Sequence, residues 1–266
     1  MSDLYEIDKL AVSFPDLTSK PLFGAAPRTQ ILKGLSFTIP RGEILGIVGG
    51  SGSGKSTLGR ALVRLIEPNA GTIRFGGKDI THLAEAELRP LRRRFQMIFQ
   101  DPMSSLNPRH RVGKLIAAPL RLLDIADPKQ AAYEALDHVG LPRGFATRYP
   151  HELSGGQRQR VGIARAIALK PDFILADEIV SGLDVSSQAQ VLALLERLVD
   201  ELGLTLAFIS HDLSVIRRLC TRILVLHCGK IVEQAPTAEL FSNPSDAYTR
   251  ELLDAIPLPD PDQPWF

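Results

Sequence analysis

The chain has 266 residues, of which 44% are hydrophobic and 23% are charged, and its formal net charge is +1. This length and balance are those of a globular protein with one compact unit, so disorder is excluded as the default state. A net charge near zero argues against nucleic acid as a partner, because binding to nucleic acid relies on a broad basic surface.

The N-terminal residues 1–8 carry acidic groups where a secretory signal needs a basic region followed by an apolar one, so export is not expected. Apolar runs such as 44–48 and 223–226 are strand-sized, far below the roughly 20 residues that a bilayer span needs. Any association with a membrane is therefore expected to go through a partner. Cys220 and Cys228 match neither a redox pair nor a zinc site and are interpreted as reduced, cytosolic thiols.

The first predicted elements are strands and one helix. Alternating apolar residues at 31–39 predict a half-buried strand with Leu35, Phe37 and Ile39 on one face, and 44–48 predict a buried strand. Apolar residues at helical spacing then predict a helix after the glycines, ending before Pro68. A short strand at 72–75 is expected next, with a turn at Gly76 and Gly77.

The character of the chain changes at 101–152, where six prolines separate short helical stretches such as 130–139. This pattern predicts an inserted helical subdomain. Strand and helix then alternate, which predicts a parallel sheet covered by helices. The expected elements are strands at 173–176, 205–209 and 222–226, with helices at 189–202 and after His211. The proline-rich tail 257–266 is expected to be extended or loose.

A phosphate-binding loop follows the buried strand at 44–48 and opens the predicted helix, which is the context that the G-x-x-x-x-G-K-[ST] motif requires. Its residues are Gly49, Gly50, Ser51, Gly52, Ser53, Gly54, Lys55, Ser56 and Thr57. Glycines let successive N–H groups point inward, and the helix N-terminus adds partial positive charge. Lys55 is expected to reach the β- and γ-phosphates of ATP, and the Ser56 hydroxyl to bind Mg²⁺.

Two adjacent acids, Asp177 and Glu178, end the apolar run that begins at Phe173. A strand would deliver both to the carboxyl end of the sheet, beside the phosphate-binding loop, and would point them to opposite sides. Asp177 is assigned to hydrated magnesium, and Glu178 is expected to orient or deprotonate the attacking water. A solvated strand end is the competing interpretation, which the upstream phosphate loop makes weaker.

Another apolar strand, 204–209, leads to His211, which is expected at the same edge of the sheet. An imidazole there could hydrogen-bond the γ-phosphate and sense its presence. A lone histidine in such a position more often has a structural role. The functional interpretation of His211 is favoured only because it follows the other motifs in the expected order along the chain. The other five histidines have no such context and are assigned no role.

A second anion site is indicated at Ser154, Gly155, Gly156 and Gln157. Ser154 is a suitable N-cap, and the two glycines expose the N–H groups of a helix N-terminus. About 100 residues separate this site from the phosphate-binding loop. A single chain therefore has little use for it on the same nucleotide.

These residues together resemble the ATP-binding cassette (ABC) ATPases, in which LSGGQ is the signature motif. The resemblance spans nearly the whole chain and includes six motifs in the family's order. They are the phosphate loop at 49–57, the Q-loop Gln100, the signature at 153–157, Asp177 and Glu178, the D-loop at 181–184, and the switch His211. Two residues depart from the common pattern, Ile179 where many members have proline and Gly182 where they have alanine.

The resemblance implies an α/β fold: a P-loop NTPase core with a parallel sheet, an N-terminal antiparallel β subdomain and a helical subdomain at about 101–165. It implies ATP and Mg²⁺ as cofactors, with Gln100 contributing to catalysis and to the metal site. It further implies a head-to-tail dimer in which Ser154–Gln157 of one subunit close over ATP held by Lys55 of the other. An aromatic side chain is expected to stack on adenine. Phe14 fits best, with Tyr5 and Phe23 as alternatives and plain core packing as the competing role of Phe14.

Further detail resembles the ATPases of the peptide/nickel importer branch. The runs at 100–109 and 243–257 are typical of that branch, and the second falls in a C-terminal extension at about 232–258 of an ATPase domain that spans 1–256. Gly50 stands where that branch often has glutamate. Such importers usually pair two different ATPases, one of which often carries a C-terminal cysteine cluster for an iron-sulfur centre. This chain has no such cluster and resembles the other ATPase.

The partners implied are a second, non-identical ATPase, two transmembrane permease subunits and an extracytoplasmic solute-binding protein. The expected location is the cytoplasmic face of the bacterial inner membrane, reached only through the permeases. The alternative is a soluble accessory ATPase of an enzyme complex such as carbon-phosphorus lyase. The solute stays open among peptides, opines, nickel chelates and glycosides.

Overall fold

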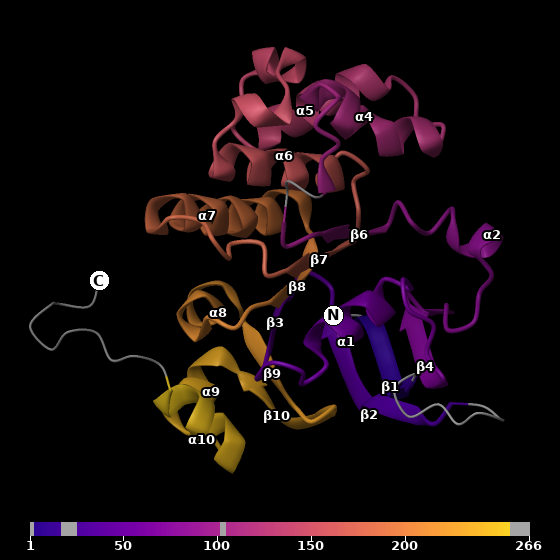
Figure 1. The fold of residues 1–266 in the computed structure, drawn as a ribbon, viewed down its shortest axis with the longest axis vertical. Coiled ribbons are helices and arrows are strands. Elements are labelled where there is room, and N and C mark those ends of the chain that lie inside the picture. Colours follow the sequence, from indigo (N-terminus) through magenta and orange to yellow (C-terminus); the bar gives the residue numbers. More distant parts are fainter. Residues whose placement is uncertain (1–2, 17–25, 102–104, 256–266) are drawn as a thin grey trace, which may run out of the picture.

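The computed structural model describes residues 3–16, 26–101 and 105–255. Two β-sheets form the lower part of the molecule in Figure 1, and a group of helices lies above them. The tail 257–266 and Phe23 lie outside the described residues, so nothing is said of their structure. Within the described ranges, no helix has both the length and the apolar character needed to cross a membrane.

The first sheet is antiparallel and has the strand order β2-β1-β4-β5. Its strands are β1 (Asp3–Pro15), β2 (Arg28–Pro40), β4 (Ala70–Phe75) and β5 (Lys78–Asp79). Leu35, Phe37 and Ile39 are buried on one face of β2, as predicted. The long strand β1 was not predicted. Several register shifts interrupt its pairing with β2, and these irregularities break the simple alternation by which a strand is found in a sequence.

The second sheet has the strand order β10-β9-β3-β8-β7-β6. Its strands are β3 (Ile44–Val48), β6 (Phe95–Ile98), β7 (Phe173–Asp177), β8 (Thr205–Ile209), β9 (Arg222–His227) and β10 (Lys230–Pro236). All neighbouring pairs are parallel except β9 and β10, which are antiparallel. Every residue of β3, β7 and β8 is buried, as expected for parallel strands covered on both faces.

The parallel strands explain why distant parts of the sequence meet. The segments that leave β3, β6, β7 and β8 all emerge at the same, carboxyl edge of the sheet, because these strands run in one direction. Lys55, Gln100, Glu178 and His211 lie in or next to these four segments. This edge is therefore the place where a site is expected in an open α/β sheet.

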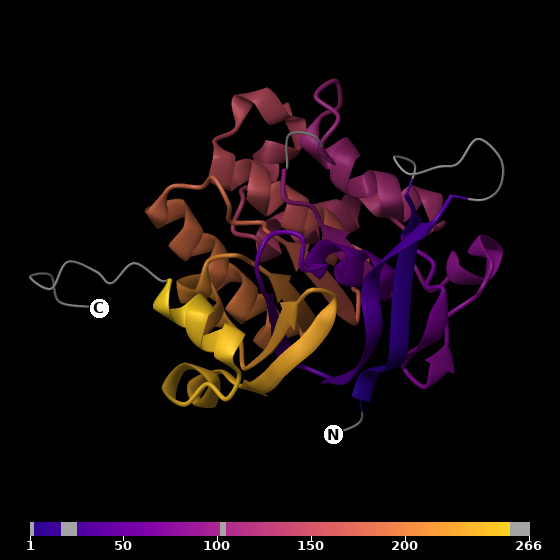
Figure 2. The same cartoon turned by 60° about the horizontal axis from the view of Figure 1, so that its bottom comes forward.

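Helices cover the second sheet and form a layer above it. They are α1 (Lys55–Leu62), α2 (Glu85–Leu88), α4 (Val112–Leu122), α5 (Pro128–His138), α6 (Gly155–Ile167), α7 (Val185–Leu202), α8 (Leu213–Leu219), α9 (Thr237–Ser242) and α10 (Ala247–Asp254), with short 3-10 turns at Arg143–Thr147 and Pro150–Glu152. Figure 1 shows α4, α5 and α6 together at the top. Figure 2 shows the C-terminal helices, in yellow, beside the β9–β10 hairpin. The expected parallel sheet, antiparallel sheet and helical segment are thus all present.

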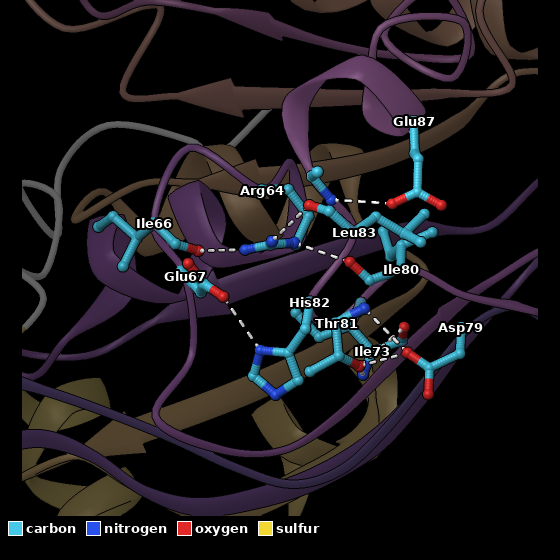
Figure 3. A network of polar contacts seen from close by, with 11 residues as sticks. Arg64, Ile66, Glu67, Ile73, Asp79, Ile80, Thr81, His82, Leu83 and Glu87 are labelled. Atoms are coloured by element: carbon cyan, nitrogen blue, oxygen red, sulfur yellow. Dashed lines mark hydrogen bonds and ion pairs between the residues drawn. The ribbon is translucent and has the colours of Figure 1, made fainter.

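Helix α1 is shorter than predicted, because it ends at Leu62 and not just before Pro68. Arg64 has a positive φ of 51°, which a continuing right-handed helix does not allow. Its side chain points back into the protein, where Nε donates to the Ile80 carbonyl oxygen at 2.8 Å and Nη2 to that of Leu83 at 3.3 Å (Figure 3). The last predicted turn is therefore replaced by a bend that ties α1 to the segment before α2.

Helix α7 begins at Val185, four residues earlier than predicted. The carboxylate of Asp184 accepts a 2.9 Å hydrogen bond from the N–H of Ser187 and so caps the helix N-terminus. Asp184 belongs to the D-loop, and its capping role ends that loop where the helix starts. The helix was predicted from apolar residues that recur on a buried face. Val185 is 84% exposed and does not belong to that face, so the pattern did not reveal the first turn.

Candidate nucleotide-binding site

A cavity of about 550 Å³ lies at the carboxyl edge of the parallel sheet. It brings together residues from β1, β2, the loop after β3, and the segments after β7 and β8. The lining residues are Phe14, Ile31, Ser51, Gly52, Gly54, Lys55, Ser56, Thr57, Glu178 and His211. All of them except Ile31 were singled out in the sequence. Ile31 had no polar or aromatic signal, since it occupies an ordinary apolar position of β2.

The phosphate-binding loop connects β3 to α1 in a shape that needs glycine. Gly54, directly before α1, has φ 106°, a conformation that residues with a side chain rarely adopt. A Cβ at Gly49 would lie 2.1 Å from the carbonyl oxygen of Leu226, at the end of β9. The loop is therefore pressed against β9 on one side and opens into the cavity on the other, with the N-terminus of α1 facing an incoming anion.

Lys55 lies along its own loop. Its Nζ donates to the carbonyl oxygens of Gly49 and Gly50, at 2.7 Å and 2.9 Å, and only 8% of the residue is exposed. Burial lowers the pKa of Lys55, although Glu178 and Asp177 oppose that shift. The ammonium group is thus held at the loop by neutral acceptors and lines a cavity to which Glu178 contributes a carboxylate.

Asp177 is the last residue of β7 and is buried. The hydroxyl of Ser56, in the first turn of α1, donates to its Oδ1 at 3.4 Å. Burial raises the pKa of Asp177, and the hydrogen bond from Ser56 acts in the opposite direction. A hydroxyl and a carboxylate oxygen are therefore adjacent at the floor of the site, which are donor types that Mg²⁺ prefers.

Glu178 does not lie on β7, so strand alternation does not separate the two acids as predicted. It leaves the strand with φ 51°, and its N–H donates to the carbonyl oxygen of Ile209 at 2.9 Å. This left-handed turn next to β8 directs the Glu178 side chain into the cavity. The direction of the Glu178 side chain is therefore set by this local backbone conformation and not by the pleat of the strand.

Two polar side chains converge on the Glu178 carboxylate. Nε2 of Gln100 donates to Oε2 at 2.9 Å, and Nδ1 of His211 lies 3.6 Å from Oε1. Gln100 follows β6 and His211 follows β8, the two strands that flank β7. The side chain of Glu178 is 23% exposed and that of His211 is 66% exposed, so the group lies at the open mouth of the cavity.

Of the two aromatic candidates within the described residues, Phe14 lies at the cavity and Tyr5 does not. Phe14 belongs to β1, is 42% exposed and lines the cavity wall. Tyr5 is completely buried between Phe75 and Phe173, and its hydroxyl donates to the carbonyl oxygen of Leu62 at 3.1 Å. That alternative is therefore wrong, because no nucleotide could reach its ring. Phe23 lies outside the described residues.

The signature segment lies away from this cavity, and none of Ser154–Gln157 lines it. Ser154 caps α6, and its Oγ accepts from the N–H of Gln157 at 3.3 Å while the Gln157 side chain accepts from the N–H of Ser154 at 3.0 Å. Ser154 is exposed, and Gly155, Gly156 and Gln157 are half-buried. The phosphate-binding loop and the signature segment are therefore separate features of the single chain.

The two departures in the D-loop region have different surroundings. Ile179 is 1% exposed and is part of the hydrophobic core. Gly182 has φ 77° with no other atom within 4 Å of an added Cβ. A side chain there would meet backbone strain but no steric clash.

Two named proteins are similar to this chain over most of its length. The oligopeptide transport ATP-binding protein OppF of Bacillus subtilis is 52% identical over 233 residues, which cover 86% of this chain and 76% of that protein. OppF of Haemophilus influenzae is 44% identical over 263 residues, covering 97% of this chain and 79% of that protein.

Solved structures also resemble the chain. A dimeric ATP-binding cassette in a post-hydrolysis state, bound to ADP and Pi, is 29% identical, covers 88% of this chain and 98% of its own, and has a TM-score of 0.75. The cbiO1 protein of Clostridium perfringens, part of an ABC transporter complex, is 26% identical, covers 91% of this chain and 92% of its own, and has a TM-score of 0.79. Residues 32–181 match the family model described as ABC transporter. The chain therefore belongs to the ABC transporter family, whose ATPase subunits bind and hydrolyse ATP.

Proposed function

We propose that this chain is the ATP-hydrolysing subunit of an importer for peptides or related small solutes. The observation that carries the proposal is the convergence of Gln100 and His211 on Glu178, at the cavity that holds the phosphate-binding loop. The peptide cargo is supported by the relatives, since both OppF proteins are named for oligopeptide transport. Identity of 44–52% over most of the chain favours the same role here.

The phosphate-binding loop is proposed to hold the phosphates of ATP. The N–H groups of residues 49–57 and the N-terminus of α1 supply partial positive charge, and Lys55 would exchange its bonds to Gly49 and Gly50 for the β- and γ-phosphates. Phe14, half-exposed at the cavity wall, would stack on the adenine ring.

The adjacent oxygen donors of Ser56 and Asp177 fit magnesium, and the side-chain carbonyl of Gln100 is proposed as a further ligand. Among the described residues, no cluster of three or more His, Cys, Asp or Glu side chains could hold a metal alone. This is consistent with Mg²⁺, which binds through a few protein ligands together with substrate phosphates and water. When bound, the ion would neutralise charge that develops on the phosphates.

Glu178 is proposed as the group that orients and deprotonates the attacking water. Its carboxylate is held by Gln100 on one side and approached by His211 on the other, so its direction is set before the nucleotide arrives. His211 is exposed enough to contact the γ-phosphate as well as Glu178.

The functional unit is proposed to be a dimer. The signature residues Ser154–Gln157 do not reach the cavity of their own chain, so they are free to close over ATP bound to another. The dimeric state of the solved cassette bound to ADP and Pi supports this arrangement. By resemblance to the peptide/nickel branch, the second ATPase is proposed to be non-identical.

A groove beside the Q-loop is proposed to receive a permease segment. It has a volume of about 820 Å³, and its wall includes Leu65, Phe99 and Leu122, which are 53%, 42% and 66% exposed. Phe99 directly precedes Gln100, so a permease seated here would contact the same segment that holds Glu178. The chain would then sit at the cytoplasmic face of the bacterial inner membrane through two permeases, supplied by an extracytoplasmic solute-binding protein.

The subdomain limits are proposed as predicted. The helical subdomain would span about 101–165, which includes α4, α5 and the larger part of α6. The C-terminal extension would span about 232–258 of an ATPase domain at 1–256, and it includes α9 and α10. The proline-rich tail would comprise residues 257–266.

Co-purification with the neighbouring gene products tests the importer against the alternative of an accessory ATPase of a soluble enzyme complex. Recovery with integral membrane permeases is the expected result. Recovery with a soluble phosphonate-processing core in place of permeases would overturn the proposal. If permeases are recovered, a solute screen on the associated binding protein would identify the cargo, which is expected to be a peptide.

A further inference from the structure

The C-terminal helix α10 touches the phosphate-binding loop through one side chain. The hydroxyl oxygen of Tyr248, in the first turn of α10, accepts a 2.6 Å hydrogen bond from the N–H of Gly50. The two residues are 198 positions apart. An added Cβ at Gly50 would lie 2.9 Å from this same hydroxyl, so glycine at position 50 leaves the room that Tyr248 occupies.

Gly50 is held from several sides. Its carbonyl oxygen accepts from Nζ of Lys55 at 2.9 Å and from the N–H of Ser53 at 3.2 Å, while its N–H is taken by Tyr248. The Tyr248 hydroxyl and the Lys55 ammonium group therefore act on the same residue. A shift of the tyrosine changes the position of one of the acceptors from which Lys55 must move when phosphates bind.

Tyr248 is itself fixed by its surroundings. Its ring lies against that of His227, with centroids 3.8 Å apart, and its N–H donates to the capping carboxylate of Asp246 at 2.8 Å. The Glu233 carboxylate of β10 accepts from the N–H groups of Ser245 and Asp246, at 2.8 Å and 3.1 Å. The start of α10 is thus anchored to β10, which gives the Tyr248 hydroxyl a defined place behind the loop.

The β9–β10 hairpin supports the loop from the same side. The N–H of Gly229 donates to the carbonyl oxygen of Ser53 at 3.1 Å, and the end of β9 presses against Gly49. The hairpin contacts the loop at Gly49 and at Ser53, whereas the N–H of Gly50 is bound by Tyr248. From these contacts we infer that Tyr248 is a positioning residue of the nucleotide site, which sets ATP affinity by holding the Gly50 end of the phosphate-binding loop.

This inference rests on the proposed ATP site, and binding of a fluorescent ATP analogue tests it directly. Tyr248→Phe keeps the ring on His227 and removes only the acceptor. It is expected to raise the Kd for the analogue and the KM for ATP about two- to tenfold, the scale of one hydrogen bond, with a smaller effect on kcat. Tyr133→Phe is the matched control, because it removes the hydroxyl of a half-buried tyrosine in α5, which does not line the cavity. It should leave the Kd unchanged.

Gly50→Ala approaches the same contact from the other partner. It should weaken binding in the wild-type chain, because the added Cβ meets the Tyr248 hydroxyl, and should have little further effect in Tyr248→Phe. Comparing the two single variants with the double variant tests the inference even if Tyr248→Phe lowers the melting temperature. Equal Kd values for Tyr248→Phe and wild type, or additive effects in the double variant, would overturn it. Failure of the wild-type chain to bind the analogue would instead overturn the proposed function.

Discussion

The side-chain amide of Gln100 donates a 2.9 Å hydrogen bond to the carboxylate of Glu178. Gln100 leaves the edge strand β6, and Glu178 leaves the neighbouring strand β7. Phe99, beside Gln100, is exposed in the groove assigned to a permease. A movement of that segment would therefore shift a partner of the proposed general base. In the proposed function, this bond links the segment that would contact a permease to the group that would activate water.

Gln100→Ala is expected to lower kcat about tenfold or more, because a hydrogen bond to a charged group contributes roughly 1.5–3 kcal/mol. The Kd for ATP should change less than kcat, since the phosphate-binding loop is untouched. Steady-state ATPase assays and binding titrations measure the two effects separately. Gln130→Ala is a suitable control, because Gln130 lies on the exposed surface of α5 and bonds only to its own helix. Equal loss in both variants would contradict the role of Gln100.

Lys55→Ala should weaken ATP binding by at least about tenfold, the scale expected when a charged hydrogen-bond donor to phosphate is removed. The lost group is the only side-chain cation among the residues that line the cavity, His211 aside. Lys78→Ala, in the exposed strand β5, removes the same charge from a different place and should bind ATP normally. Titration with a fluorescent ATP analogue makes the comparison, and similar affinities for the two variants would be inconsistent with the proposal.

Ser154→Arg should leave ATP binding by the single chain largely intact but remove hydrolysis by the assembled pair. The arginine would occupy the helix N-terminus proposed to close over the partner's ATP, while the cavity of its own chain does not contain Ser154. Light scattering in the presence of ATP should show less dimer. Because loss of the cap costs about 1 kcal/mol of stability, the melting temperature is measured alongside. Ser242→Arg, on the exposed surface of α9, is the control.

Glu233→Gln should destabilise the start of α10 at neutral pH. Burial alone would raise the pKa of Glu233, but its hydrogen bonds together, the largest contribution coming from the N–H of Ser245, outweigh burial and lower the pKa. The carboxylate therefore stabilises the fold above the ordinary glutamate pKa of about 4.3, and this stabilisation is lost as pH falls through the lower folded value. The melting temperature of the variant should be roughly 2–4 °C lower at pH 7, the scale of about 1 kcal/mol. A difference that stays constant from pH 7 to about pH 3 would argue against this assignment.

The parts of the site that depend on local spacing could be predicted from the sequence. The phosphate-binding loop is one example, because a strand, a glycine-rich turn and a helix start follow one another within a few residues. Phe14 was preferred over Tyr5, but Tyr5 could not be excluded from the sequence, because both are aromatic residues of one strand and only burial separates them. The turn at Glu178 was missed for a similar reason, since φ 51° depends on the bond to Ile209.

The fold shows the same division between local and distant information. Buried parallel strands were found because nearly all of their residues are apolar, whereas β1 was hidden by its register shifts. The early end of α1 depends on Arg64, whose buried hydrogen bonds to 80–83 are tertiary contacts. The bond between Gly50 and Tyr248 has no counterpart in any sequence pattern, because it joins two segments from opposite ends of the chain.

The ATP turnover of Glu178→Gln tests the central claim most directly. Glutamine keeps the size of the side chain and an oxygen acceptor for Gln100 but cannot take a proton from water. Turnover is predicted to fall at least about a hundredfold, the scale of a lost general base, while ATP still binds and holds the dimer closed. Glu201→Gln, an exposed carboxylate of α7, should retain normal turnover. Near-normal hydrolysis by Glu178→Gln would contradict the account.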